Sequence, residues 1–95
     1  MKKEKNEIII FHWADACMHG TDQKTREEWK KSKLVEGIVV GHIVDETKEH
    51  ITVAMDLFFA GQPNIENNNY RQVAAYPKSG IKKILKRFSI APNYI

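Results

Sequence analysis

A chain of 95 residues has room for a single domain, because a protein of this size buries only about two-thirds of its unfolded surface in one core. Hydrophobic residues make up 42% and charged residues 28%, which excludes a disordered chain, and no apolar run approaches the roughly 20 residues that span a bilayer. The net charge is only +3, but six Lys and Arg and no acidic residue follow Glu66, so this segment attracts anions such as phosphates, nucleotides or nucleic acid.

The sequence begins with a predicted strand and a predicted helix. Glu7 to Trp13 is rich in β-branched and aromatic side chains, which is typical of a strand. Thr25 and Glu28 match a capping box, in which the two side chains satisfy free backbone N–H groups at a helix start. We therefore expect a short helix over residues 25–31, with Trp29 on its buried side.

Two further strands follow, joined by a polar turn. Leu34 to Val44 is rich in β-branched residues, and Gly37 and Gly41 predict that this strand bends or approaches another backbone closely. Asp45 to Glu49 supplies the turn. From Ile51 to Phe59, mainly apolar positions alternate with more polar ones, so this segment predicts a half-buried strand that forms an antiparallel hairpin with the strand before it.

The last third of the chain predicts a loop and two strands. Asn64 to Asn69 is typical of a loop, where we expect mobility. Tyr70 to Tyr76 predicts a strand, ended by Pro77, which cannot donate to a ladder. After a turn at Ser79-Gly80, residues 81–88 have helical spacing but also the length of a strand. We favour a strand, because a sheet of four strands would leave exposed edges, and a helix is the alternative.

Together these elements predict a mostly β (α+β) fold. It looks like a small five-stranded antiparallel barrel of the SH3-like or Sm-like kind, with one short helix after the first strand. We expect one domain over residues 1–95, with residues 1–6 disordered and residues 89–95 forming a tail. A lone Cys17 cannot form an internal disulfide, which fits a reducing compartment, and we expect a cytoplasmic location.

Five short segments resemble a pattern found in small bacteriophage-encoded proteins of uncertain function. They are Trp13-Ala14-Asp15-Ala16, Val40-Gly41-His42-Ile43-Val44, Asp45-Glu46, Ile51-Thr52-Val53-Ala54 and Pro77-Lys78-Ser79-Gly80-Ile81. Tyr76, where an aliphatic residue is expected, and the longer loop from Ala60 to Asn69 depart from the pattern. The resemblance implies a phage origin and a compact β fold. It also fits proteins that antagonise host defence, some of which sequester cyclic nucleotide signals in the host cytoplasm.

No group of residues predicts catalysis. His12, Asp15, Cys17 and His19 offer atoms that bind transition metals, but their spacing matches no standard zinc pattern. No nucleophile signature surrounds Cys17, and the paired acids of the chain lie in segments where solvated acids are usual. We therefore predict that the protein is not an enzyme and has no catalytic residue, metal site or cofactor.

Cations combined with aromatic rings favour binding of a nucleotide-like anion, because bases stack on rings and Lys and Arg hold phosphates. A carboxylate on the polar side of a strand can also accept hydrogen bonds from a base edge or ribose. Core packing of Trp13 and simple solvation of the acids and the basic segment are the alternatives. The predicted ligand-binding residues are Trp13, Asp15, Asp56, Tyr70, Arg71, Tyr76, Lys78 and Lys82.

The leading functional hypothesis is a non-catalytic phage-type protein that sequesters a nucleotide-like small molecule to antagonise host defence. An Sm-like RNA-binding module is the second hypothesis, and a direct protein-binding inhibitor of a host enzyme is the third. We expect a homo-oligomer, because small barrels with open strand edges commonly pair them across subunits. No membrane partner is predicted.

Overall fold

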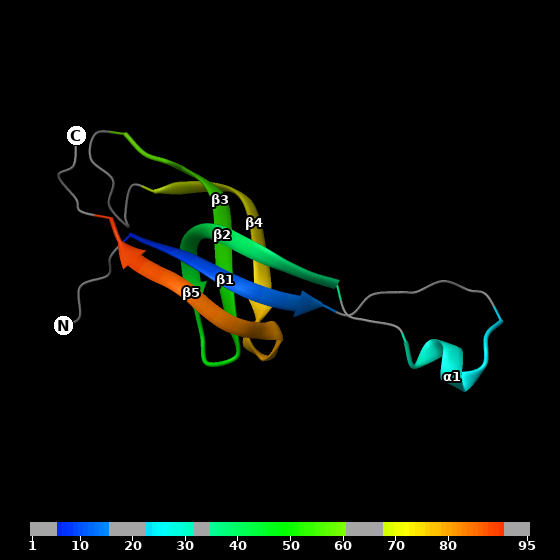
Figure 1. The fold of residues 1–95 in the computed structure, drawn as a ribbon. Helices are drawn as coiled ribbons and strands as arrows, with labels where there is room; N and C mark the ends of the chain where they lie inside the picture. Colours follow the sequence, from blue (N-terminus) through cyan, green and yellow to red (C-terminus); the bar gives the residue numbers. More distant parts are fainter. Residues whose placement is uncertain (1–5, 16–22, 32–34, 61–67, 91–95) are drawn as a thin grey trace.

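The computed structural model describes residues 6–15, 23–31, 35–60 and 68–90. Within these ranges the chain forms a five-stranded sheet, a short α-helix and a turn of 3-10 helix (Figure 1). The elements are β1 (Glu7–Asp15), α1 (Arg26–Trp29), β2 (Val35–Glu46), β3 (His50–Phe58), β4 (Asn69–Pro77), η1 (Lys78–Gly80) and β5 (Ile81–Ser89).

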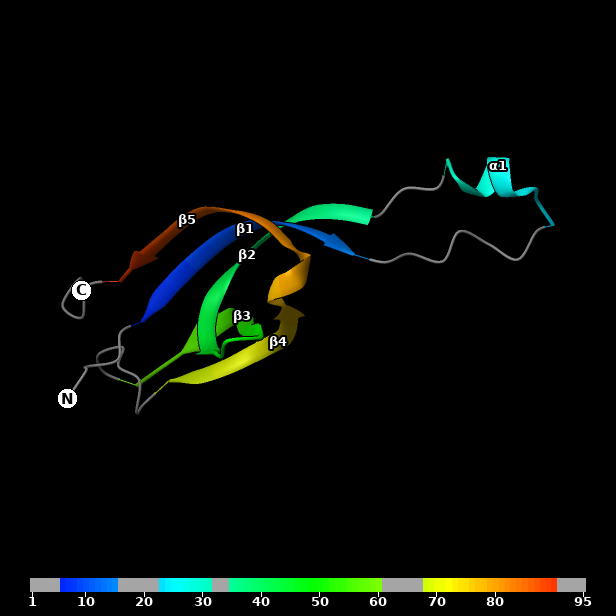
Figure 2. The same cartoon turned by 90° about the horizontal axis from the view of Figure 1, so that it is seen from below.

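The sheet is antiparallel throughout, with the order β4-β3-β2-β1-β5. Strands β1 to β4 follow one another as a meander, and β5 returns to pair with β1. The predicted mostly β fold with five antiparallel strands is therefore confirmed, as is a strand over residues 81–88. The sheet bends so that β5, β1 and β2 lie over β3 and β4 (Figure 2).

The sheet is not closed into a barrel. No ladder joins β4 to β5 in the described part of the chain, so these two strands are its edges. The reason lies in η1, which turns the chain from the layer of β4 into the layer of β5, so that the two strands leave it in different layers (Figure 2). The prediction of a closed barrel was wrong for the described residues.

The core lies between the two layers. Its buried centre consists of Ile9 and Phe11 from β1 and Ile51 and Val53 from β3, all at most 4% exposed. Gly41 on β2 makes close packing possible, because a Cβ there would lie 2.9 Å from the carbonyl oxygen of Ala54. At Gly37 a Cβ would meet nothing within 4 Å, so only one of the two glycines marks a close approach.

Strand β3 is buried over only half of its length. Ile51 and Val53 face the core as the alternation predicted, but Met55 is 68% exposed. The β2–β3 ladder ends at Ala54, so the rest of β3 has no neighbour on that side. The burial of β3 residues therefore depends on how far β2 runs alongside them. The alternation of apolar and polar residues does not predict that length.

The predicted helix is present but contributes nothing to the core. Thr25 caps α1 and forms the predicted capping box with Glu28. No residue of α1 is buried, and the helix lies away from the sheet (Figure 1). Trp29 is only partly covered, with the Lys24 ammonium 5.0 Å from its ring centroid. Because α1 has no buried residue, the prediction that Trp29 lies on a buried side was wrong. No helix in the described ranges is long and apolar enough to cross a membrane.

The described structure includes residues that the sequence analysis assigned to a disordered start and to a tail. Ser89 belongs to β5, and the Ile90 N–H donates to the Asn6 carbonyl at 2.8 Å. Asn6 also accepts a hydrogen bond from the side chain of Asn68, and Asn69 already belongs to β4. The remaining residues of the predicted disordered start, of the asparagine loop and of the tail, at 1–5, 61–67 and 91–95, lie outside the described residues.

Candidate functional site

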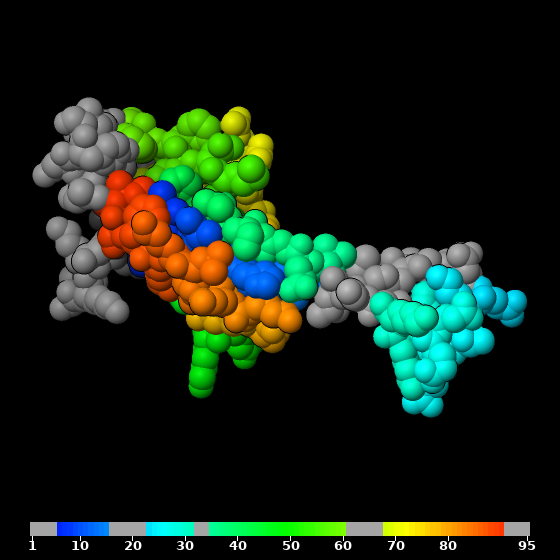
Figure 3. Space-filling model, in the orientation of Figure 1, coloured from blue at the N-terminus to red at the C-terminus, as the bar shows by residue number. Residues whose placement is uncertain are grey.

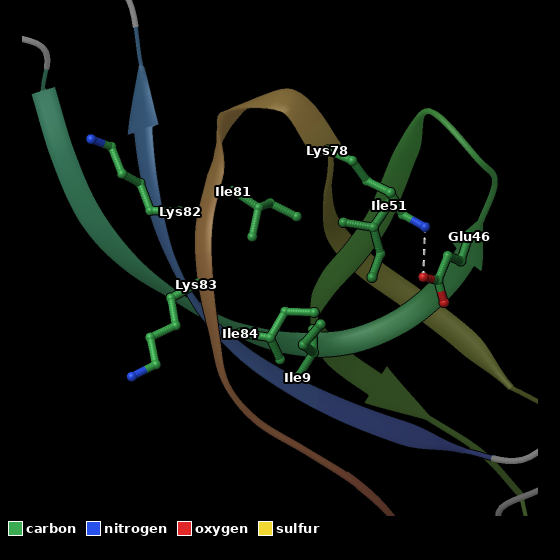
Figure 4. Close-up of a pocket in the computed structure, with 8 residues that line it drawn as sticks. All are labelled: Ile9, Glu46, Ile51, Lys78, Ile81, Lys82, Lys83 and Ile84. Carbon is green, nitrogen blue, oxygen red and sulfur yellow. Dashed lines mark ion pairs between the residues drawn. The ribbon is translucent and has the colours of Figure 1, made fainter.

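A pocket of about 330 Å³ opens on the core side of β5, beside the seam where the sheet is not closed. Four isoleucines from three strands line it and point toward one another (Figure 4). Ile9 and Ile51 are 1% exposed and continue into the core, whereas Ile84 is 51% exposed. The pocket is thus an apolar hollow that is open to solvent on the β5 side. Its isoleucines are Ile9, Ile51, Ile81 and Ile84.

An irregularity in β5 brings two of these isoleucines to one face. Residues three apart on a regular strand point to opposite sides. Ile81 pairs with Trp13 and Ile84 with Phe11, and a register shift between these pairs leaves Lys82 without a partner on β1. Such a bulge adds one residue, so both isoleucines face the core. The helical spacing seen in residues 81–88 is therefore accommodated by a bulged strand.

Two charged residues of the pocket lining, Glu46 and Lys78, belong to a chain of four linked charged side chains. The Glu46 carboxylate accepts from Lys78 Nζ and from Arg87 Nη2, each at 2.8 Å, and Arg87 Nε donates to Glu7 at 2.8 Å. Hydrogen bonds from Arg87 and then from Lys78 lower the pKa of Glu46 to about 2. Bonds to Glu7 and Glu46 raise the pKa of Arg87. These contacts join β1, β2, η1 and β5 and neutralise Lys78.

Two lysines supply the unbalanced positive charge at the pocket. Lys82 and Lys83 form no ion pair with any other residue in the described ranges. Their side chains extend from β5 away from the isoleucines (Figure 4). Because a lysine ammonium sits on a flexible four-carbon stem, both groups can swing toward an anion held at the pocket mouth.

The predicted rings Trp13 and Tyr76 are packing groups rather than open stacking surfaces. Both are partly buried and pack against the core, with their ring centroids 5.0 Å apart in an edge-to-face contact. Tyr76 also meets the Phe11 ring edge to face at 5.4 Å. The indole N–H of Trp13 is buried and has no hydrogen-bond partner among the described residues. It lies next to Gly80, where a Cβ would be 2.7 Å from Trp13 Nε1. The core-packing alternative therefore describes both rings.

Asp56 and Arg71 lie elsewhere, on the side of β3 and β4 that faces away from the core. They are partners in the ladder and form an ion pair at 3.1 Å, and the guanidinium lies 5.1 Å from the centroid of the Phe58 ring. Tyr70 precedes Arg71 and therefore points to the opposite face. Its hydroxyl accepts from Asn68 Nδ2 at 3.0 Å.

The eight predicted residues thus do not form one site. Lys78 and Lys82 line the pocket, and Asp15 is exposed at the end of β1, opposite Val35. Of the residues considered for a metal site, His12 contacts Glu36 at 2.9 Å. Cys17 and His19, the other two residues of that group besides Asp15, lie outside the described residues.

Sequence reasoning missed Glu46, the residue that organises the polar side of the pocket. It was assigned to a solvated turn together with Asp45, but β2 continues through both residues. A register shift between Ile43 and Asp45 places Glu46 opposite Ile51, on the core side. Nothing in the sequence marks that bulge. Lys78 and Arg87 are also far from Glu46 in the chain, so the sequence does not show that these three residues form ion pairs.

Comparisons with protein-family models, curated proteins and solved structures found no match for this chain. The resemblance to small phage proteins stays a prediction.

Proposed function

We propose that this protein is a non-catalytic binding protein that captures a small anionic ligand of the nucleotide type. The observation that carries this proposal is the pocket at the open seam, which combines an isoleucine lining with two β5 lysines, Lys82 and Lys83, that form no ion pair within the described residues. Small-molecule sites are usually concave and mostly apolar, with a few polar groups that orient the ligand. A nucleotide has the matching parts, since its base is flat and apolar on both faces and its phosphate is charged.

Each part of such a ligand has a partner in the pocket. The base packs between the isoleucines, and Lys82 and Lys83 hold the phosphate as mobile point charges. Glu46 stays ionised at neutral pH, because its pKa is about 2, and its carboxylate can accept from a ribose hydroxyl or an exocyclic amine. The volume of about 330 Å³ is near the lower end of the roughly 300–1,000 Å³ typical of ligand sites, so it suits one nucleotide unit.

The finer fold assignment and the biological role belong to the same proposal. An SH3-like or Sm-like relationship is supported by the meander of β1 to β4, the return of β5 to β1, and the 3-10 turn between β4 and β5. Antagonism of a host defence in the host cytoplasm is supported by the resemblance of the sequence to small phage proteins. Sequestration requires binding alone, which agrees with a site built from isoleucines, lysines and a carboxylate.

Native mass spectrometry of the purified protein with a panel of cyclic and linear nucleotides and a short RNA tests the proposal. A nucleotide retained at fixed stoichiometry supports it and identifies the ligand by mass. Changing Lys82 and Lys83 together to Ala should weaken that complex by about tenfold or more, because both phosphate contacts are lost. Lys48→Ala, in the exposed β2–β3 turn, is the matched control and should change nothing. A protein that retains no nucleotide refutes the proposal.

Salt dependence separates this proposal from RNA binding. Binding of one nucleotide should depend weakly on salt, whereas an RNA that contacts several cations should lose orders of magnitude in affinity as salt rises. An RNA module also needs exposed rings for stacking, and the structure packs Trp13 and Tyr76 against the core.

Direct protein binding is the second candidate, and the exposed end of β3 and β4 favours it. Phe58 and Val73 are each 49% exposed and lie on the same side of β3 and β4, and exposed apolar side chains on one face often mark protein interfaces. Changing Phe58 to Arg should abolish inhibition of a host enzyme under this hypothesis and leave nucleotide binding intact. Inhibition that survives this change argues against the surface.

A further inference from the structure

The side of β5, β1 and β2 that faces away from the core forms a continuous surface, here called the outer face (Figure 3). Cross-strand partners in a ladder point to the same side of a sheet, and neighbours along a strand alternate. Because Ile9 and Phe11 point into the core, the residues between and beside them point outward. With their ladder partners, these residues are Ile8, Ile10 and His12 on β1, Ile38, Val40 and His42 on β2, and Lys83, Lys86 and Phe88 on β5.

The centre of the outer face is apolar and exposed. Ile38 and Val40 are 58% and 57% exposed, and Phe88 is 39% exposed. Ile8 and Ile10 lie between them on β1 and are partly buried. Isolated apolar residues on a surface are ordinary, but a contiguous group spanning three strands is typical of an interface.

The charges of the outer face have opposite signs on its two sides. Lys83 and Lys86 lie on β5, where neither forms an ion pair with another residue in the described ranges. Glu36 lies on β2 and contacts His12 of β1 at 2.9 Å. Lys83 is the ladder partner of His12, whose partner on β2 is Ile38, and Glu36 lies two residues before Ile38. The charges therefore run diagonally across the face, from a cation through a histidine to a carboxylate, and a reversed copy of the face presents them in the opposite order.

We infer that two copies of this chain dimerise face to face through the outer face, about a two-fold axis parallel to β1. This axis places β5 of one copy over β2 of the other, so that Lys83 lies over the partner's Ile38. The flexible stem of Lys83 then reaches the partner's Glu36, two residues away on the same strand. It also places Ile10 against the partner's Ile10 and Phe88 over the partner's His42. A two-fold axis across the strands would instead bring the lysines of the two β5 strands together, and like charges oppose that arrangement.

The pocket stays open in this dimer. The pocket lies on the core side of β5, and the contact uses the opposite side of the same strand. Lys83 is used by both the proposed phosphate contact and the dimer, so Lys82→Ala alone, outside the outer face, tests the ligand without changing the dimer contact. The inference does not rest on the proposed ligand.

Sedimentation equilibrium of the full chain over a wide concentration range tests the inference. We expect a mass that rises to twice the 11.0 kDa of one chain. Val40→Arg should weaken the dimer by about a hundredfold, because it would bury an unpaired charge in the apolar centre. Val73→Arg is the matched control, since Val73 is similarly exposed at 49% but lies on β4, in the other layer, and it should leave the dimer intact.

A charge exchange tests the orientation and does not depend on the stability of a single variant. Lys83→Glu and Glu36→Lys should each weaken the dimer by about tenfold, because each sets like charges against one another. The variant carrying both changes should recover the dimer to within about threefold of the original. A chain that stays at 11.0 kDa throughout, an equal loss with Val40→Arg and Val73→Arg, or a double variant no better than either single one overturns the inference.

Discussion

Replacing Glu46 with Gln should remove the charge that holds η1 and β5 to the end of β2. The carboxylate bonds Lys78 and Arg87, each at 2.8 Å, and its side chain is 30% exposed. Gln preserves the size of the side chain but leaves Lys78 without a counter-charge, whereas Arg87 keeps Glu7. The change therefore isolates the electrostatic contribution of one carboxylate.

The magnitude follows from the pKa of Glu46, which lies at about 2 in the folded protein against a usual 4.5. At about 1.4 kcal/mol per pKa unit this difference corresponds to about 3 kcal/mol, an upper bound, because solvent screens a partly exposed group. We expect a loss of about 1–2 kcal/mol in the free energy of unfolding at pH 7. With a typical urea m-value of about 1–3 kcal/mol/M, the midpoint should fall by roughly 1 M.

The free energy of unfolding should also depend on pH through the Glu46 carboxylate. A carboxylate with a depressed folded pKa stabilises the protein above its unfolded pKa and loses this effect as the pH falls through the folded value. The stabilisation by Glu46 should therefore be complete above pH 4.5 and disappear toward pH 2. Urea unfolding of both proteins at pH 7 and near pH 2 measures it. Glu49→Gln, in the exposed turn, is the control, and an equal stability of the original, Glu46→Gln and Glu49→Gln proteins would refute the reasoning.

Three further predictions concern single residues. Gly80→Ala should lower the free energy of unfolding by about 1–3 kcal/mol, because the new Cβ would lie 2.7 Å from Trp13 Nε1. The fluorescence of Trp13 should also shift, and unchanged urea unfolding would contradict this prediction. Burial lowers the pKa of His42 and the charge of Asp56 opposes this, so stability should fall as the pH drops below about 6.5, and Asp56→Asn should lower the pKa of His42 further in an NMR titration. Gln72 has φ 59°, so Gln72→Val should cost about 1 kcal/mol or more in thermal unfolding while Gln72→Gly is tolerated, and an equal effect of the two changes would count against strain at this position.

Most strand positions could be predicted from local patterns, whereas the site could not. The segment at Glu7 to Trp13 and the hairpin around Asp45 to Glu49 follow from β-branched density, alternation and turn composition. The structure does not bring the predicted residues together, because Tyr70 and Arg71, adjacent in the sequence, point to opposite faces of β4. Trp13, expected at a binding surface, instead packs against the core.

The sequence by itself determined the first four strands, the capped helix, and the basic character of the C-terminal segment, because each depends on residues close together in the chain. It left residues 81–88 open between a strand and a helix, and pairing with β1 decided for a strand. Only the tertiary structure decided which residues share a face. Bulges after Ile43 and at Lys82 rotate Glu46, Ile81 and Ile84 toward the core, and they arise from pairing with strands distant in the sequence. The same long-range pairing left β4 and β5 unjoined, so the pocket is a property of the assembled sheet and of no single segment.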